Sequence, residues 1–335
     1  MPLPFIPILL GGAALIAGGY GAKKGYDAKK NFDQASRITD EAKTIYDKTM
    51  TSLQSVRVET EGQLKNLGRI KCELYEKTLL RFVNVFQTIK NIDLSDLNLT
   101  SDLAIDECEF AEIRETALKM TDVLGGAAVS LTGGALAGIG AFGGAGLLAT
   151  ASTGTAISTL SGVAATNATL AWFGGGALAA GGLGMAGGMV VLGGVVAAPV
   201  LLVGGLMMSS KSERAVSDAY SNLDKAKGAV EVMKSARTAA RAILRRAEEM
   251  QDVLEQLTIP FEDHVDDLAD LSGFNTDYRT YSERERKLVG ATCALAKTVK
   301  NVMETPIFDE EGRVTNASRD VIGKARDFVV SLSHM

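Results

Sequence analysis

The chain has 335 residues, enough for two average domains, with a formal net charge of −5 and only 6% aromatic residues. Such an acidic balance gives no support for nucleic-acid binding. The charges are segregated, because residues 123–210 contain no Asp, Glu, Lys, Arg or His and hold 23 of the 36 glycines. The sequence therefore predicts an apolar segment set within a charged helical protein.

The first segment, residues 1–22, carries no charged side chain and has about the length of apolar chain that crosses a bilayer. Pro4 and Pro7 make it a weak helix at its start. Lys23 and Lys24 follow the apolar stretch, which is the reverse of a cleavable secretion signal. If the segment inserts, the positive-inside rule keeps the rest of the chain in the cytoplasm, at the inner face of the cell membrane. The alternative is an arm packed on the protein's own apolar segment.

The second segment, residues 23–122, is predicted to be a long amphipathic helix over residues 27–89 followed by a shorter helix over 106–122. Apolar and small residues recur at steps of three and four with charged residues between them, a pattern typical of coiled-coil packing. The positions of this stripe are Ala35, Ile38, Ala42, Ile45, Thr49, Leu53, Val56, Thr60, Leu64, Leu67, Ile70 and Leu74. Gly62 and Gly68 are the expected weak points of the long helix.

The third segment, residues 123–210, is too long for a single membrane span and is predicted to be a helical hairpin. Its two arms (123–149 and 177–208) are the most apolar parts, and the tip (150–176) is richer in Ser and Thr. Small residues spaced by four allow the close helix packing found in membranes, as in a glycine zipper. The candidate membrane-inserting and helix-packing residues are Gly134, Gly138, Gly140, Gly144, Gly184, Gly188, Trp172 and Phe173. The alternative is that the hairpin is sheltered inside a soluble helical bundle.

The fourth segment, residues 211–335, is predicted to contain a long return helix over 211–257 that Pro260 stops. A further helix is expected to begin with a capping box at Ser282, and a last amphipathic helix covers 317–332. Because no stretch alternates β-branched and polar residues, the fold class is all-α. The two long helices that flank the hairpin are expected to lie antiparallel, as an elongated bundle or coiled-coil stalk.

Two glycine motifs, at residues 138–143 and 182–187, match G-x-G-x-x-G. Dinucleotide binding also requires a preceding strand and an acidic residue about 20 positions later, and no acidic residue follows before Glu213. We therefore predict no nucleotide or other cofactor. The cysteines are too widely spaced for a zinc site, and no catalytic set of Ser, His and Asp can be named, so we predict no metal and no enzymatic activity.

A basic stripe with helical spacing lies in the fourth segment. Together with the lysines after the N-terminal apolar stretch it gives the candidate contacts to anionic lipid, which are Lys23, Lys24, Lys234, Arg237, Arg241 and Arg245. The alternative is a solvated coiled-coil face neutralised by Glu248 and Glu249.

The order of parts resembles that of α-helical pore-forming toxins of the cytolysin A and haemolysin BL type: a long helix, an uncharged Gly/Ala-rich hairpin, a second long helix and shorter helices. A looser resemblance is to apolipoprotein L-like proteins, and residues 152–176 are similar to a segment of uncharacterised bacterial proteins. The first resemblance implies a hairpin that inserts after release from a soluble bundle, with protomers assembling into a ring. Unlike these toxins, the chain shows no cleavable signal, which favours action on a membrane of the producing cell.

Three functions remain open. The first is a homo-oligomeric protein that inserts its hairpin and permeabilises or remodels a bilayer. The second is a membrane-anchored coiled-coil scaffold that recruits protein partners, and the third is a soluble helical interaction protein with the apolar segment buried. A polar stripe along the hairpin helices would favour a pore, whereas an anchor needs none.

Overall fold

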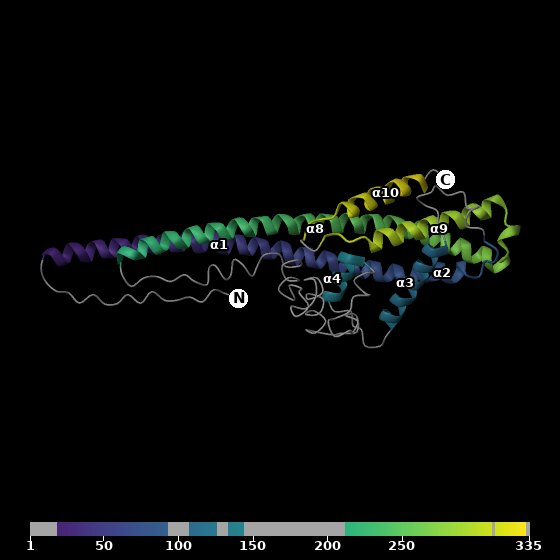
Figure 1. Cartoon of the computed structure of the whole chain (residues 1–335), viewed down its shortest axis with the longest axis horizontal. Helices are drawn as coiled ribbons and strands as arrows, with labels where there is room; N and C mark the ends of the chain where they lie inside the picture. The colour runs from purple at the N-terminus through teal and green to yellow at the C-terminus, as the bar shows by residue number, and fades with distance from the viewer. Residues whose placement is uncertain (1–18, 93–106, 126–132, 144–211, 310–311, 333–335) are drawn as a thin grey trace. The chain divides into compact units, whose positions relative to one another are not determined.

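The computed structural model describes residues 19–92, 107–125, 133–143, 212–309 and 312–332 (Figure 1). Within these residues every regular element is helical and no strand is present, so the predicted all-α class is confirmed. The elements are α1 (Gly19–Glu73), the π-helical turn η1 (Leu74–Leu79), α2 (Leu80–Phe86), α3 (Glu107–Gly125), α4 (Gly133–Phe142), α8 (Ser212–Phe274), the 3-10 turn η6 (Tyr278–Thr280), α9 (Glu283–Glu304) and α10 (Asn316–Leu332). The predicted short helix, capping-box helix and last helix correspond to α3, α9 and α10.

The chain divides into two compact units. Unit 1 comprises residues 1–56 and 195–238, and unit 2 comprises residues 57–194 and 239–335. Because α1 and α8 each contribute to both units, the packing of these two helices is described separately within each one.

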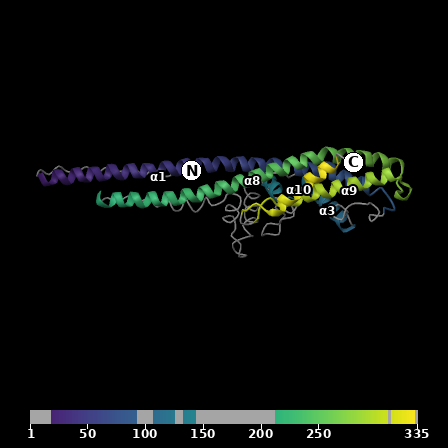
Figure 2. The same ribbon diagram turned by 90° about the horizontal axis from the view of Figure 1, so that it is seen from above.

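In unit 1, the first parts of α1 and α8 pack through two apolar clusters. One joins Ala35, Ile38 and Ala42 to positions 215–226, and the next joins Tyr46 and Leu53 to positions 229–236. The contacts therefore advance in the same direction along both helices, which run parallel (Figures 1 and 2). The antiparallel arrangement expected from the sequence is wrong for this pair.

Unit 2 shows the same direction of pairing along its parts of α1 and α8. Hydrogen bonds join Thr60 to Ala240, Asn66 to Gln251, Thr78 to Glu262 and Lys90 to Thr276. The antiparallel expectation treated the apolar segment as a local hairpin that reverses the chain. A parallel pair instead requires a long crossover connection, and residues 87–211 are long enough to provide it.

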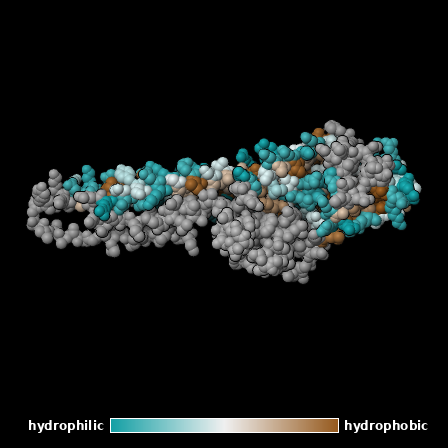
Figure 3. All heavy atoms as spheres, viewed as in Figure 1, coloured by the Kyte–Doolittle hydropathy of each residue, from teal (hydrophilic) through white to brown (hydrophobic). Residues whose placement is uncertain are grey.

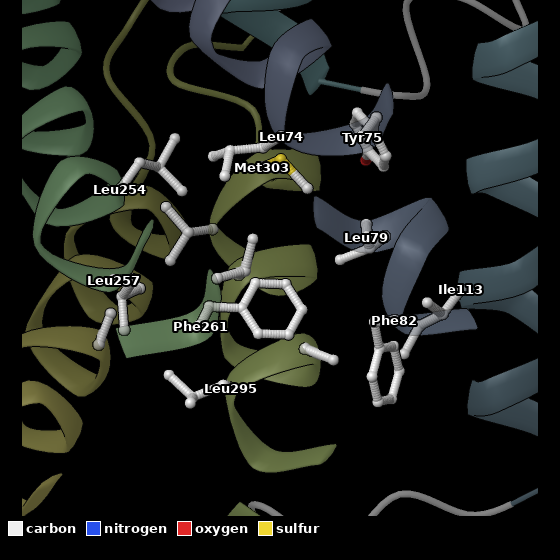
Figure 4. Close-up of a cluster of buried hydrophobic side chains, with 14 of the residues drawn as sticks. Leu74, Tyr75, Leu79, Phe82, Ile113, Leu254, Leu257, Phe261, Leu295 and Met303 are labelled. Carbon is white, nitrogen blue, oxygen red and sulfur yellow. The ribbon is translucent and has the colours of Figure 1, made fainter. Parts of the chain in front are cut away.

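The core of unit 2 is formed by side chains from several helices (Figure 4). Phe261 of α8 lies between Leu295 of α9 and the aromatic ring of Phe82 of α2, with the two ring centroids 6.0 Å apart. The other labelled members of this cluster are Leu74, Tyr75, Leu79, Ile113, Leu254, Leu257 and Met303. This core holds α1, η1, α2, α3, α4, α8, α9 and α10 together.

Pro260 does not end the second long helix, since α8 continues through it to Phe274. Proline lacks the N–H that would bond the carbonyl of Gln256, but Gln256 is exposed and water can bind its carbonyl. Leu257 and Phe261, on either side of Pro260, are completely buried. Packing on both sides of the proline therefore outweighs its local preference to stop the helix.

The predicted capping box at the start of α9 is confirmed. The Ser282 side chain accepts a hydrogen bond from the backbone N–H of Glu285, and the Glu285 carboxylate accepts one from the N–H of Ser282 at 2.6 Å. This pair satisfies two of the N–H groups left free at a helix N-terminus.

The parallel direction in unit 1 can be tested with spin labels on exposed positions, in a chain in which Cys108 is replaced by Ser. We expect the pairs Glu41→Cys/Ser221→Cys and Gln54→Cys/Lys234→Cys to give similar short distances in double electron–electron resonance. Each pair is offset by 180 residues along the chain, as are Thr60 and Ala240. In an antiparallel pair the axial offsets of the two label pairs would differ by about 40 Å, from 13 residues at 1.5 Å each in opposite directions, so the two distances could not both be short.

Candidate functional site

Within the apolar segment the structure describes the last residues of α3, the helix α4 and Gly143, and α4 lies in the interior of unit 2. Its ten residues are all Gly, Ala, Leu, Ile or Phe. Ala137, Ile139 and Ala141 are almost completely buried. A helix that is apolar on every side is stable only when other elements or lipid cover it, and here its neighbours include α1 and the chain that follows α9.

The contact between α4 and α1 is a direct contact of two backbones at Gly68 and Gly140. A Cβ atom on Gly68 would lie 1.9 Å from the carbonyl oxygen of Leu136, and one on Gly140 would lie 2.0 Å from that of Leu64. Neither position can accept a methyl group without moving one helix. Gly68 was predicted as a weak point of the long helix, but α1 continues through it and the missing side chain makes room for α4.

The C-terminal end of α4 is fixed by a third glycine. Gly143 has a φ of +64°, a left-handed conformation common at the residue after a helix. A Cβ atom there would also lie 2.0 Å from the carbonyl oxygen of Met303 in α9. The N–H of Ile307 donates to the carbonyl of Ala141 at 2.8 Å, which satisfies one of the free carbonyls at this helix end.

Lys71 of α1 is completely buried, and its Nζ donates a hydrogen bond to the carbonyl oxygen of Gly140 at 2.9 Å. This places an amino group at the C-terminal end of α4, where the helix dipole favours positive charge. Burial lowers the pKa of Lys71 to about 7, and the neighbouring Cys72 acts in the opposite direction. The ammonium form is therefore costly in this position, although the free carbonyls of α4 partly compensate.

A polar network lies beside this contact. Lys300 of α9 pairs with Glu304 at 3.2 Å and with Glu112 of α3 at 3.1 Å. Burial lowers the pKa of Lys300, but the Glu304 and Glu112 carboxylates outweigh it and raise the pKa above its usual value. Burial and the Glu304 carboxylate raise the pKa of Tyr75 well above its usual value. The ion pairs thus link α3 and α9 next to the end of α4.

The sequence did not single out Lys71 or the π-helical turn η1. Lys71 continues the three-and-four spacing of the apolar stripe, between Leu67 and Leu74, so a lysine at a core position was a visible signal. The turn η1 begins just after this position and buries Tyr75 and Leu79. No local signal marks it, because a π-turn is set by the packing of its side chains.

The predicted helix-packing residues are only partly described. Gly134 and Gly138 lie within α4, and Gly138 and Gly140 are buried. Gly144, Gly184, Gly188, Trp172 and Phe173 lie outside the described residues.

The basic residues of the α8 stripe lie in different environments. Lys234 forms an exposed ion pair with Glu231 at 2.7 Å, and Arg237 donates to the hydroxyl of Ser52 in α1 at 2.9 Å. Arg241 and Arg245 are exposed. The backbones of Lys23 and Lys24 belong to α1, but their side chains are not among those that the structure describes.

The G-x-G-x-x-G motif of residues 138–143 covers the C-terminal half of α4 and its cap. A helix C-terminus presents carbonyl oxygens, whereas phosphate binding uses the N–H groups of a helix N-terminus. Among the described residues no group of His, Cys, Asp and Glu could hold a metal ion. Cys72 and Cys293 are buried free thiols, and burial raises the pKa of Cys72 to about 12.

Comparisons with protein-family models, curated proteins and solved structures found no match to the chain. Among the helices that the structure describes, none combines the length and the apolar character required to cross a membrane.

The glycine contact predicts opposite effects for two substitutions in α1. We expect Gly68→Ala to lower the free energy of unfolding by about 1–3 kcal/mol, because its methyl group would displace α4. Gly62→Ala should raise it by up to about 1 kcal/mol, because a Cβ atom there meets no other atom and alanine favours the helix. Urea denaturation measures both, and equal effects would contradict the contact.

Because Lys71 is buried, we expect the free energy of unfolding to depend on pH. Its pKa is lower in the folded chain than the ordinary lysine value, so between about pH 7 and 8.5 the unfolded chain binds more protons and stability should rise with pH. The slope is at most about 1.4 kcal/mol per pH unit. Below about pH 7 the contribution of Lys71 to the free energy of unfolding is constant. Above pH 8.5 the raised pKa values of the buried Cys72 and Cys293 make stability fall as the pH rises.

Lys71→Met should remove this rise, even if it changes stability through the lost hydrogen bond to Gly140. The measurement is urea unfolding of both chains at several pH values in that window. Identical pH slopes for the two chains would show that Lys71 does not titrate as inferred.

Proposed function

We propose that this protein inserts its apolar segment, residues 123–210, into a lipid bilayer and permeabilises or remodels it as a homo-oligomer. The observation that supports this proposal is the docking of α4 on α1 through Gly68 and Gly140. The start of an uncharged segment is thereby covered by an otherwise amphipathic helical protein. We interpret this arrangement as the state before insertion.

The type of contact supports a later role in lipid. Glycine faces allow two helix backbones to approach closely, and such contacts associate helices in membranes, where the hydrophobic effect gives no help. Gly140 uses this mode of packing within the chain. Once α4 leaves α1, the same face is free to pack on a helix of another copy.

The energetics of the docked state support its reversibility. Docking of α4 completes the burial of Lys71, whose ammonium form is disfavoured there. The favourable contributions at this site are the lysine hydrogen bond, the backbone hydrogen bond from Ile307, the close glycine contact and the burial of Ala137, Ile139 and Ala141. Undocking would remove the Ala137, Ile139 and Ala141 side chains from the cluster that contains Phe261, and the cost of burying Lys71 offsets part of that loss.

One observation favours the second candidate, a membrane-anchored scaffold that forms no pore. All ten residues of α4 are apolar or glycine, so this helix offers no polar face to line an aqueous channel. An anchor needs no such face. Binding to vesicles without leakage would therefore favour the scaffold.

The test is dye release from vesicles of phosphatidylcholine and phosphatidylserine by the full chain. We expect leakage that rises steeply with protein concentration and is lost when residues 123–210 are deleted. Because that deletion also removes α4 from the core, a second comparison uses Gly68→Ala and Gly62→Ala. Gly68→Ala should accelerate leakage several-fold by weakening the docked state, and Gly62→Ala should leak like the unchanged chain.

Each other outcome decides against the proposal. Tight binding without leakage replaces it with the scaffold. Absence of both binding and leakage in all variants favours a soluble interaction protein with the apolar segment buried. Leakage that Gly68→Ala and Gly62→Ala change equally would disconnect α4 docking from insertion.

A further inference from the structure

Unit 1 brings the beginnings of α1 and α8 to the same end of a parallel pair. Near this end Phe32 and Ala35 of α1 pack in one cluster with Ala215 and Val216 of α8. The contacts then continue in step along both helices. An antiparallel pair would instead have placed the two helix beginnings at opposite ends.

The chain that enters both helices at this end is uncharged. Residues 2–18, which precede α1, contain no charged side chain. Residues 123–210 contain none either, and Lys211 alone separates them from the start of α8. Two apolar sequences that are distant along the chain are therefore attached to one end of unit 1.

The described residues at this end carry three exposed basic side chains, two exposed acidic ones (Asp27 and Asp33) and an exposed tyrosine. Lys29, Lys30 and Arg214 are exposed, and Tyr26 is 71% exposed. From Gly19 to Phe32 the sequence holds four lysines and a single acidic residue, Asp27. Basic residues attract anionic lipid headgroups, and tyrosine is enriched at the interface between membrane and water.

The dimensions of this end match a headgroup layer. The contact residues run from Tyr26 to Arg214, which lies level with position 34, and so cover about 12 Å of helix at 1.5 Å per residue, whereas each headgroup layer is about 5–8 Å thick. The length of a lysine side chain accommodates the difference. Farther along unit 1, acidic and basic residues alternate, and the face of the described residues seen in Figure 3 is largely hydrophilic.

We infer that the end of unit 1 where α1 and α8 begin contacts an anionic bilayer end-on, through Tyr26, Lys29, Lys30 and Arg214. This inference rests on the proposed function and adds to it an orientation, a contact surface and a lipid class. The two apolar sequences adjoin this end along the chain, and α1 and α8 lead away from it.

The first experiment compares two double charge reversals in the full chain. Lys29→Glu/Lys30→Glu changes the proposed surface, and Lys225→Glu/Lys227→Glu changes net charge equally at exposed positions of the same unit. On vesicles that contain phosphatidylserine, we expect the first to weaken binding about tenfold or more and the second by less than threefold. On pure phosphatidylcholine vesicles the difference should disappear.

The second experiment measures which part of unit 1 lies nearest to the lipid headgroups. An environment-sensitive fluorophore is attached at Tyr26→Cys or, as the matched control, at exposed Tyr220→Cys of the same unit, with Cys108 replaced by Ser. We expect lipids with a nitroxide headgroup to quench the label at position 26 several-fold more than the label at position 220.

The outcomes separate this inference from the proposed function. Equal quenching at the two positions, or equal effects of the two charge reversals, overturns the end-on contact even if the vesicles leak. Quenching confined to position 26 without leakage retains the contact and overturns the permeabilising function. Absence of vesicle binding overturns both.

Discussion

The direct contact of two helix backbones at Gly68 and Gly140 is the constraint on which the packing around α4 depends. With no side chain between the helices, the last carbonyl groups of α4 must find donors from other elements. Lys71 supplies one from α1, and Ile307 supplies one from the chain after α9. The left-handed Gly143 then turns the chain against the α9 backbone. Three glycines and a buried lysine thus form one interdependent site.

This site combines tight fit with an electrostatic cost. A close backbone contact tolerates no added atom, whereas a buried amino group opposes the burial that the contact creates. The neighbouring Lys300 differs, because two carboxylates compensate for its burial. Close backbone packing therefore holds α4 in place more than charge compensation does. This balance suits a helix that is proposed to leave its position.

The parallel direction of α1 and α8 changes how the apolar segment relates to the rest of the chain. With an antiparallel pair, residues 123–210 would be a hairpin between two adjacent helix ends. In the parallel pair, the segment begins with the last residues of α3, continues through α4 in unit 2 and leads to the start of α8 in unit 1. The proposed docking of α4 and the proposed membrane contact of unit 1 thus concern opposite ends of one uncharged sequence.

The sequence by itself determined the all-α class, the long amphipathic helices, the capping box at Ser282 and the separation of charged from uncharged chain. These features follow from periodicity, capping and composition, which act over a few neighbouring residues. The candidate site was only partly predictable: Gly140 was singled out, but its partner Gly68 was interpreted as a weak point. The tertiary structure alone decided the parallel direction, the continuation of α8 through Pro260 and the burial of Lys71. Each of these depends on contacts between residues far apart in the chain, which outweigh local preference, although the place of Lys71 in the apolar stripe was a visible signal.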